Sequence, residues 1–286
     1  MTGLGTGINL WIRSITWLWI ITGTIGIFAH DHINGGAVSN DPGSALVFSN
    51  GDRYSTSKGW VMFLDGEDET GGWRIGTGLT FGALPASVST GGPVAGHAAL
   101  GSCLELEFVE LLGPKGARLN VWQRYEDFGW RFLLVRLEVG GATGGQRIWL
   151  SENDGSAGSD PYGHIHGREF WVDQPGLYVL KVRLVDTSTQ GTGGGPIHVP
   201  SAVLSLYLQA QNTLQAEWIH ADGLKLSYAV RGHETWAVEE SQALGEGAAW
   251  REVHRAGGST QGFLASFVID EGVGARFYRL RQVTGF

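Results

Sequence analysis

Short apolar runs separated by turn residues dominate the chain after residue 30. In LELEFVELL (104–112), Leu104, Leu106 and Phe108 fall on one face of an extended chain, and Glu105 and Glu107 fall on the other. In LYVLKVRLVD (177–186) one face is likewise apolar, made by Tyr178, Leu180, Val182 and Leu184. Period-2 alternation of this kind predicts strands with one buried and one solvated face.

Similar runs recur at short intervals without intervening helical spacing. The predicted strands are 44–49, 59–64, 104–112, 118–123, 130–139, 147–151, 169–172, 177–186 and 203–210. Strands of this length and spacing predict an all-β fold, and specifically an antiparallel, jelly-roll-like β-sandwich.

The pattern restarts after QNTLQ (211–215), with six further short runs before the end of the chain. Residues 215–286 are therefore predicted to form a second, smaller domain, a fibronectin-III-like β-sandwich. Its large aromatic side chains are expected to anchor the core, with a sugar-binding platform as the alternative. These residues are Trp218, Trp236, Trp250 and Phe277.

The first 29 residues have the pattern of a secretory signal peptide. Arg13 is followed by an uncharged apolar stretch that ends at the small residue Ala29. An uncleaved membrane anchor is the alternative, although the stretch is short for a spanning helix. The expected organisation is a signal peptide (1–29), a β-sandwich surface-protein domain (30–210) and a small β domain (215–286), secreted or at the cell surface, with no membrane span in the mature chain.

Composition narrows the classes of partner. The chain has 46 glycines and a formal net charge of −8. No basic patch is visible, and nucleic-acid binding requires one, so nucleic acid is excluded as a partner. Cys103 is the single cysteine, which excludes an internal disulfide.

Two H-x-H pairs carry the most specific candidate chemistry. His30 and His32 lie at the predicted mature N-terminus, and His164 and His166 precede an apolar run. On a strand, residues i and i+2 share a face, so two imidazoles can approach one ion. Zinc takes three or four protein ligands, so the two pairs together would complete a site. Two separate structural uses of the pairs remain the alternative, and His97 and His198 are reserve ligands.

Cleavage after Ala29 would give a mature chain beginning at His30. A free amine with His32 at the third position can hold Cu(II) in a square-planar set of nitrogens. Amino-terminal histidine is also the copper ligand of secreted oxidative enzymes, which makes a copper-dependent enzyme an alternative.

The stretch HIHGREFWVDQPGLYVLKVRL resembles a bacterial surface-anchored protein domain family. The family motif is matched by His164, His166, Phe170, Trp171, Pro175, Gly176 and Tyr178. The resemblance covers roughly residues 30–210, and it implies an exported protein that is often attached to the cell envelope and is in some lineages associated with metal uptake. The ending RFYRLR (276–281) resembles a small, structural C-terminal β domain of secreted proteins from Verrucomicrobia-like bacteria.

These observations predict an exported, envelope-associated or secreted protein that binds a transition metal, most simply zinc, and is not an enzyme. Its expected partners are the metal ion and components of the cell envelope. A structural or adhesive surface protein without metal is the main alternative. The acidic cluster DGEDET (65–70) is interpreted as a solvated turn, because its spacing fits no calcium motif.

Overall fold

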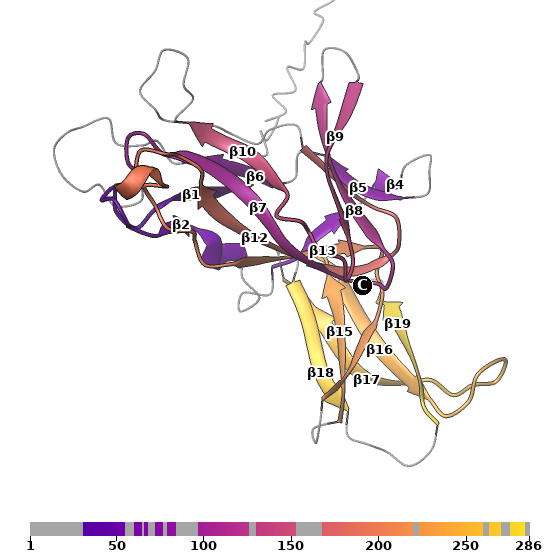
Figure 1. Ribbon diagram of the computed structural model, residues 1–286. Coiled ribbons are helices and arrows are strands. Elements are labelled where there is room, and N and C mark those ends of the chain that lie inside the picture. The colour runs from indigo at the N-terminus through magenta and orange to yellow at the C-terminus, as the bar shows by residue number, and fades with distance from the viewer. Residues whose placement is uncertain are drawn as a thin grey trace, which may run out of the picture.

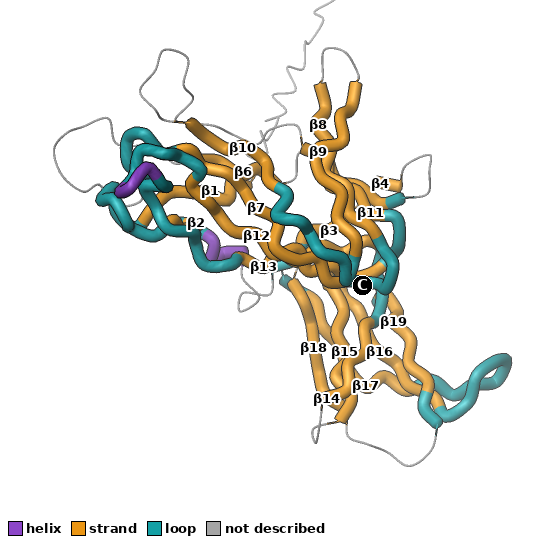
Figure 2. Tube along the Cα trace, in the orientation of Figure 1, coloured by secondary structure: helices purple, strands orange, loops and turns teal. Residues whose placement is uncertain are grey.

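The structure is a computed structural model that describes residues 31–54, 60–64, 66–67, 72–76, 79–83, 97–125, 130–152, 168–219, 223–259, 263–269 and 275–283. Apart from two short 3-10 turns, the regular structure of these residues is entirely β (Figure 2). The prediction of an all-β fold is therefore confirmed. Within these ranges no helix combines the length and apolar composition needed to cross a membrane.

Three sheets account for the strands before residue 211 (Figure 1). Their orders are β2-β1-β6, β10-β7-β12-β13-β3 and β4-β5-β11-β8-β9. The strands are β1 (Asp31–Ala37), β2 (Leu46–Phe48), β3 (Met62–Leu64), β4 (Gly66–Glu67), β5 (Trp73–Gly76), β6 (Leu79–Ala83), β7 (Cys103–Leu112), β8 (Arg118–Tyr125), β9 (Trp130–Glu138), β10 (Arg147–Glu152), β11 (Arg168–Val172), β12 (Gly176–Asp186) and β13 (Leu204–Ala210).

Side chains from all three sheets meet in one hydrophobic cluster. Ile33 of β1, Phe108 of β7, Val121 of β8 and Leu184 of β12 are fully buried in it. The alternation read from the sequence produces this arrangement, because every second residue of β7 and β12 points into the cluster. Each fully buried side chain of this size stabilises the fold by about 1.5–3 kcal/mol.

Gly35 explains how β1 can lie so close to β12. A Cβ atom at this position would lie 2.9 Å from Cδ1 of Leu184, closer than two carbon atoms can approach. A larger residue at position 35 would therefore force the buried side chain of Leu184 to move.

The six strands after residue 214 form two three-stranded sheets, β14-β15-β18 and β17-β16-β19, which Figure 1 shows below the other strands. They are β14 (Gln215–Ile219), β15 (Gly223–Val230), β16 (Thr235–Ser241), β17 (Arg251–Gly257), β18 (Phe263–Ile269) and β19 (Phe277–Gln282). A second hydrophobic cluster, centred on Tyr228, Leu226 and Val238, draws on both sheets. The two clusters share no residue.

Two expectations about these strands are corrected. Trp218 does not anchor a core, because its exposed fraction is 68%. It lies on β14, the last strand of its sheet, opposite Leu224, so a neighbouring strand covers only one side of it. In addition, the pairing is not wholly antiparallel, since β1 pairs with β6 and β3 with β13 in parallel.

The chain passes from the first group of strands to the second through a short polar connection. Gln209 donates a hydrogen bond to the hydroxyl of Thr213 at 3.2 Å. The guanidinium of Arg231, at the end of β15, lies 4.8 Å from the ring centre of Phe63 on β3. This cation–π contact joins the two groups of strands directly.

Candidate functional site

The four predicted metal ligands fall at the margins of the described structure. His30, His164 and His166 lie outside the described residues, and His32 is described for its backbone alone. His32 is the second residue of β1, which pairs with β2 and β6. The strand that follows the other H-x-H pair, β11, pairs with β5 and β8 instead. Among the described residues, β1 and β11 do not pair with each other.

Strand pairing nevertheless brings the starts of β1 and β11 into one neighbourhood. Glu169 on β11 pairs with Gly76, the last residue of β5, and Asp31 on β1 pairs with Leu79, the first residue of β6. Because three residues of chain extend at most about 11 Å and paired Cα atoms lie about 5 Å apart, Asp31 and Glu169 are within about 22 Å of each other. The described residues nearest to the two H-x-H pairs, Asp31 and Glu169, are therefore no farther apart than this distance.

His198, one of the reserve ligands, is occupied by the fold. Its Nε2 accepts a hydrogen bond from the N–H of Ala99 at 2.8 Å, and its Nδ1 donates to the carbonyl of Ser44 at 3.0 Å. The residue is 2% exposed. A metal would have to displace one of these bonds, so His198 is a structural histidine.

The loop that carries His198 is fastened by a buried carboxylate. Asp186, at the end of β12, accepts hydrogen bonds from four main-chain N–H groups at 2.9–3.0 Å. The donors are Cys103, Ser188, Ile197 and His198. Charge-assisted bonds of this kind hold both ends of the loop to the start of β7.

The other reserve ligand, His97, has a buried Nδ1 with no hydrogen-bond partner among the residues that the structure describes. No group of three or more histidine, cysteine, aspartate or glutamate side chains within the described ranges is arranged to hold a metal ion.

A second polar cluster lies on the solvent-facing side of β7, β10 and β12. The carboxylate of Glu107 is contacted by Arg147 at 3.1 Å and, more closely, by Arg183. Burial alone would raise the pKa of Glu107, but hydrogen bonds from Arg183 and Arg147 outweigh it and hold the pKa below its usual value. The three residues join three strands and leave little of the carboxylate accessible, which makes this a structural cluster.

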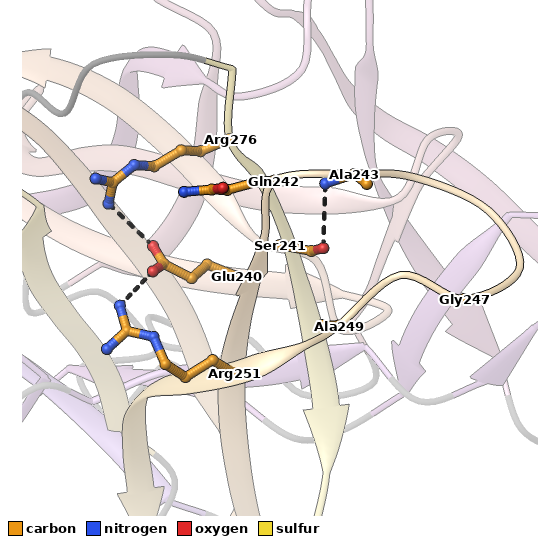
Figure 3. Close-up of a pocket in the computed structure, with 8 residues that line it drawn as sticks. All are labelled: Glu240, Ser241, Gln242, Ala243, Gly247, Ala249, Arg251 and Arg276. Atoms are coloured by element: carbon orange, nitrogen blue, oxygen red, sulfur yellow. Dashed lines mark hydrogen bonds and ion pairs between the residues drawn. The ribbon is translucent and has the colours of Figure 1, made fainter.

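A third polar cluster lines a pocket at one end of the smaller group of strands. Glu240 on β16 forms ion pairs with Arg251 on β17 and with Arg276, which precedes β19 (Figure 3). The sequence prediction missed it. The available signal was the alternation of β16, in which Glu240 follows Trp236 and Val238 on the face that contributes to the core.

No family model matches the sequence, and no curated protein matches it. The two resemblances noted from the sequence therefore stay predictions.

Proposed function

We propose that this chain is an exported, envelope-associated protein that binds one zinc ion through His30, His32, His164 and His166, and that it acts as a binding protein and not as an enzyme. The observation that supports the proposal is the upper bound of about 22 Å on the distance between the starts of β1 and β11. The pairing of Asp31 with Leu79 and of Gly76 with Glu169 limits how far apart the two H-x-H pairs can be.

The donor chemistry suits zinc. Four neutral imidazoles supply the nitrogen ligands and the coordination number that zinc favours. His32 directly precedes Ile33 of the core. Its main chain lies beside Thr80 of β6, which fixes the register of β1. His166 is three residues from Glu169, so a further extension of at most about 11 Å separates it from a paired strand.

We further infer that the larger group of strands is a jelly-roll-like β-sandwich and the smaller one a fibronectin-III-like β-sandwich. The support for the first is that two five-stranded sheets contribute to one hydrophobic cluster. The support for the second is the corresponding cluster between two three-stranded sheets. Such scaffolds present loops and strand ends at their margins, where binding residues commonly lie.

The proposed location rests on the apolar segment that ends at Ala29. Mass spectrometry of the mature protein, purified from a bacterial host after export, should find His30 as the first residue. A cut at another position would remove the copper alternative, which needs the amine of His30. Components of the cell envelope are the proposed macromolecular partners.

The metal proposal is tested by the zinc content of the purified protein after dialysis. The wild type should retain about one zinc per chain, and the double variant His164→Ala/His166→Ala should lose it. His233→Asn is the matched control: His233 is exposed with a φ of 66°, a conformation that asparagine adopts readily, so zinc should be unchanged. Equal zinc in the wild type and the double variant would overturn the proposal.

A further inference from the structure

The pocket beside Glu240 has the dimensions of a small-molecule site. Its volume is about 520 Å³, within the range of pockets that hold metabolite-sized ligands. It lies at the turn between β16 and β17, close to the start of β19. The lining residues are Glu240, Ser241, Gln242, Ala243, Gly247, Ala249, Arg251 and Arg276.

The charge of the lining is positive, although the protein as a whole carries a net charge of −8. Two arginines and one glutamate line the pocket, which leaves one positive charge without a counterpart among the lining residues. A ligand with a single negative charge would neutralise it. Guanidinium groups favour carboxylates because their N–H groups match the two carboxylate oxygens.

Glu240 holds both arginines in position without using all their donors. Its two oxygens accept from Nη2 of Arg251 and from Nη1 of Arg276, the latter at 3.2 Å (Figure 3). Within the described residues, the remaining N–H groups of the two guanidiniums have no other hydrogen-bond partner. The hydrogen bond from Arg251 holds the pKa of Glu240 below its usual value, so the arrangement persists at neutral pH.

The remaining lining provides groups suited to a polyhydroxylated ligand. Ser241 accepts a hydrogen bond from the N–H of Ala243 at 3.2 Å, and its O–H donates to no acceptor among the described residues. Gln242 offers an amide donor and acceptor at the rim. The other lining residues, Ala243, Gly247 and Ala249, are small and leave room for a ring-sized ligand.

We propose that this pocket binds a small organic monoanion, a sugar acid of the uronate class, whose carboxylate lies against Arg276 and Arg251. The proposal is independent of the zinc site, which involves other strands. Because the side chain of Arg251 is 75% exposed, the Kd is expected to be on the order of 1 mM.

The test is a titration of the full mature chain with sodium D-glucuronate, followed by NMR shifts of backbone amides. We expect saturable shifts around residues 240–251 and no saturable shifts with D-glucose, which has the same ring without the charge. Arg276→Gln should weaken binding about tenfold, and Arg251→Gln about threefold because it is more exposed. Arg255→Gln is the control: it lies on the same strand as Arg251, pairs with Glu252 and does not line the pocket, so binding should be unchanged.

Two other anions test whether the pocket is specific for sugar acids or binds any anion. D-glucose 6-phosphate should bind at least about threefold more weakly, because the pocket offers only one unmatched positive charge. N-acetylglycine should also bind at least about threefold more weakly, because it lacks the hydroxyl groups that the pocket can bind. Equal binding of either, equal binding of D-glucose, or unchanged binding by a folded Arg276→Gln protein would overturn the proposal. The zinc content of these variants should equal that of the wild type, which keeps this test separate from the metal proposal.

Discussion

The side-chain amide of Gln146 forms two hydrogen bonds with the main chain of Arg136. It donates to the carbonyl at 2.7 Å and accepts from the N–H at 3.2 Å. Arg136 lies on β9, the last strand of its sheet, and Gln146 directly precedes β10, the first strand of the neighbouring five-stranded sheet. The glutamine therefore occupies main-chain groups that an additional strand would otherwise use.

Gln146→Ala should increase self-association. The substitution frees the edge of β9 beside exposed apolar side chains, among them Phe132 and Leu134. Light scattering at increasing protein concentration should show oligomers in this variant at concentrations where the wild type is monodisperse. Gln282→Ala, an exposed glutamine on the edge strand β19, should behave as the wild type. Identical scattering from all three proteins would contradict this role for Gln146.

Asp186→Asn should lower the free energy of unfolding by about 3 kcal/mol. The amide loses the negative charge and turns an NH₂ group toward main-chain donors that need an acceptor. Urea denaturation at pH 7 measures the change. Asp41→Asn is the control, since Asp41 is exposed and bonds only the hydroxyl and main chain of its own turn, and it should cost less than about 0.5 kcal/mol. A similar cost for both substitutions would contradict the anchoring role of Asp186.

Glu107→Gln should destabilise the fold by about 2 kcal/mol at pH 7, because Arg147 and Arg183 would then lie close together without a carboxylate between them. The folded-state pKa of Glu107 is lowered, so its contribution is present above the ordinary value of 4.5 and is lost as the pH falls through the folded-state pKa. The wild type and the variant should therefore converge in stability in strong acid.

The control for Glu107 is Glu110→Gln on the same strand. Glu110 pairs with Lys181 at 2.6 Å, but its side chain is 45% exposed, whereas that of Glu107 is 7% exposed. An exposed pair contributes about 0–1 kcal/mol. If urea denaturation gave the same loss of unfolding free energy for both substitutions, the burial of Glu107 would not explain its contribution to stability.

His254 should make stability depend on pH between about 7.5 and 5.5. Its ring stacks on Phe267 with centres 4.2 Å apart, and its Nδ1 lies 2.9 Å from the hydroxyl of the buried Tyr228. Burial lowers the pKa of His254, so the unfolded chain takes up a proton at a higher pH than the folded one. Stability is therefore constant above the ordinary value of 6.5 and falls as the pH drops below it.

Replacing the imidazole of His254 by a ring that cannot titrate tests whether this residue causes the pH dependence of stability. In His254→Phe the loss of unfolding free energy between pH 7.5 and 5.5 should be smaller than in the wild type, measured by urea denaturation at each pH. His233→Asn, which removes an exposed histidine, should keep the wild-type slope. An unchanged slope in His254→Phe would assign the pH dependence to other groups.

Alternation in the sequence predicted the long strands well. The apolar positions of β7 and β12 are buried as expected, because each strand has neighbours on both sides and one face in the core. Alternation could not reveal β1, whose sequence DHINGGA contains two glycines and so has the composition of a turn. Gly35 is required there by the closeness of Leu184, a contact between residues distant in the sequence.

The sites were harder to predict than the strands. His198 has the same side chain as the proposed ligands, and only the positions of Ala99 and Ser44 in space show that its nitrogens are already bonded. Trp218 was expected in a core because of its size, but the sequence does not reveal that β14 is an edge strand. The pocket beside Glu240 joins one hairpin, residues 240–251, to Arg276, and the sequence does not reveal that Arg276 lies beside this hairpin.

The parallel pairing of β3 with β13 has a consequence for biosynthesis. Met62 of β3 lies beside Leu208 of β13. The early strand β3 can therefore pair only after β13, the last strand of the larger group, has left the ribosome. Contacts between such distant parts of a chain form slowly, since a long loop must close before they add stability. The pairing of β3 with β13 can therefore form only after most of the chain has been synthesised.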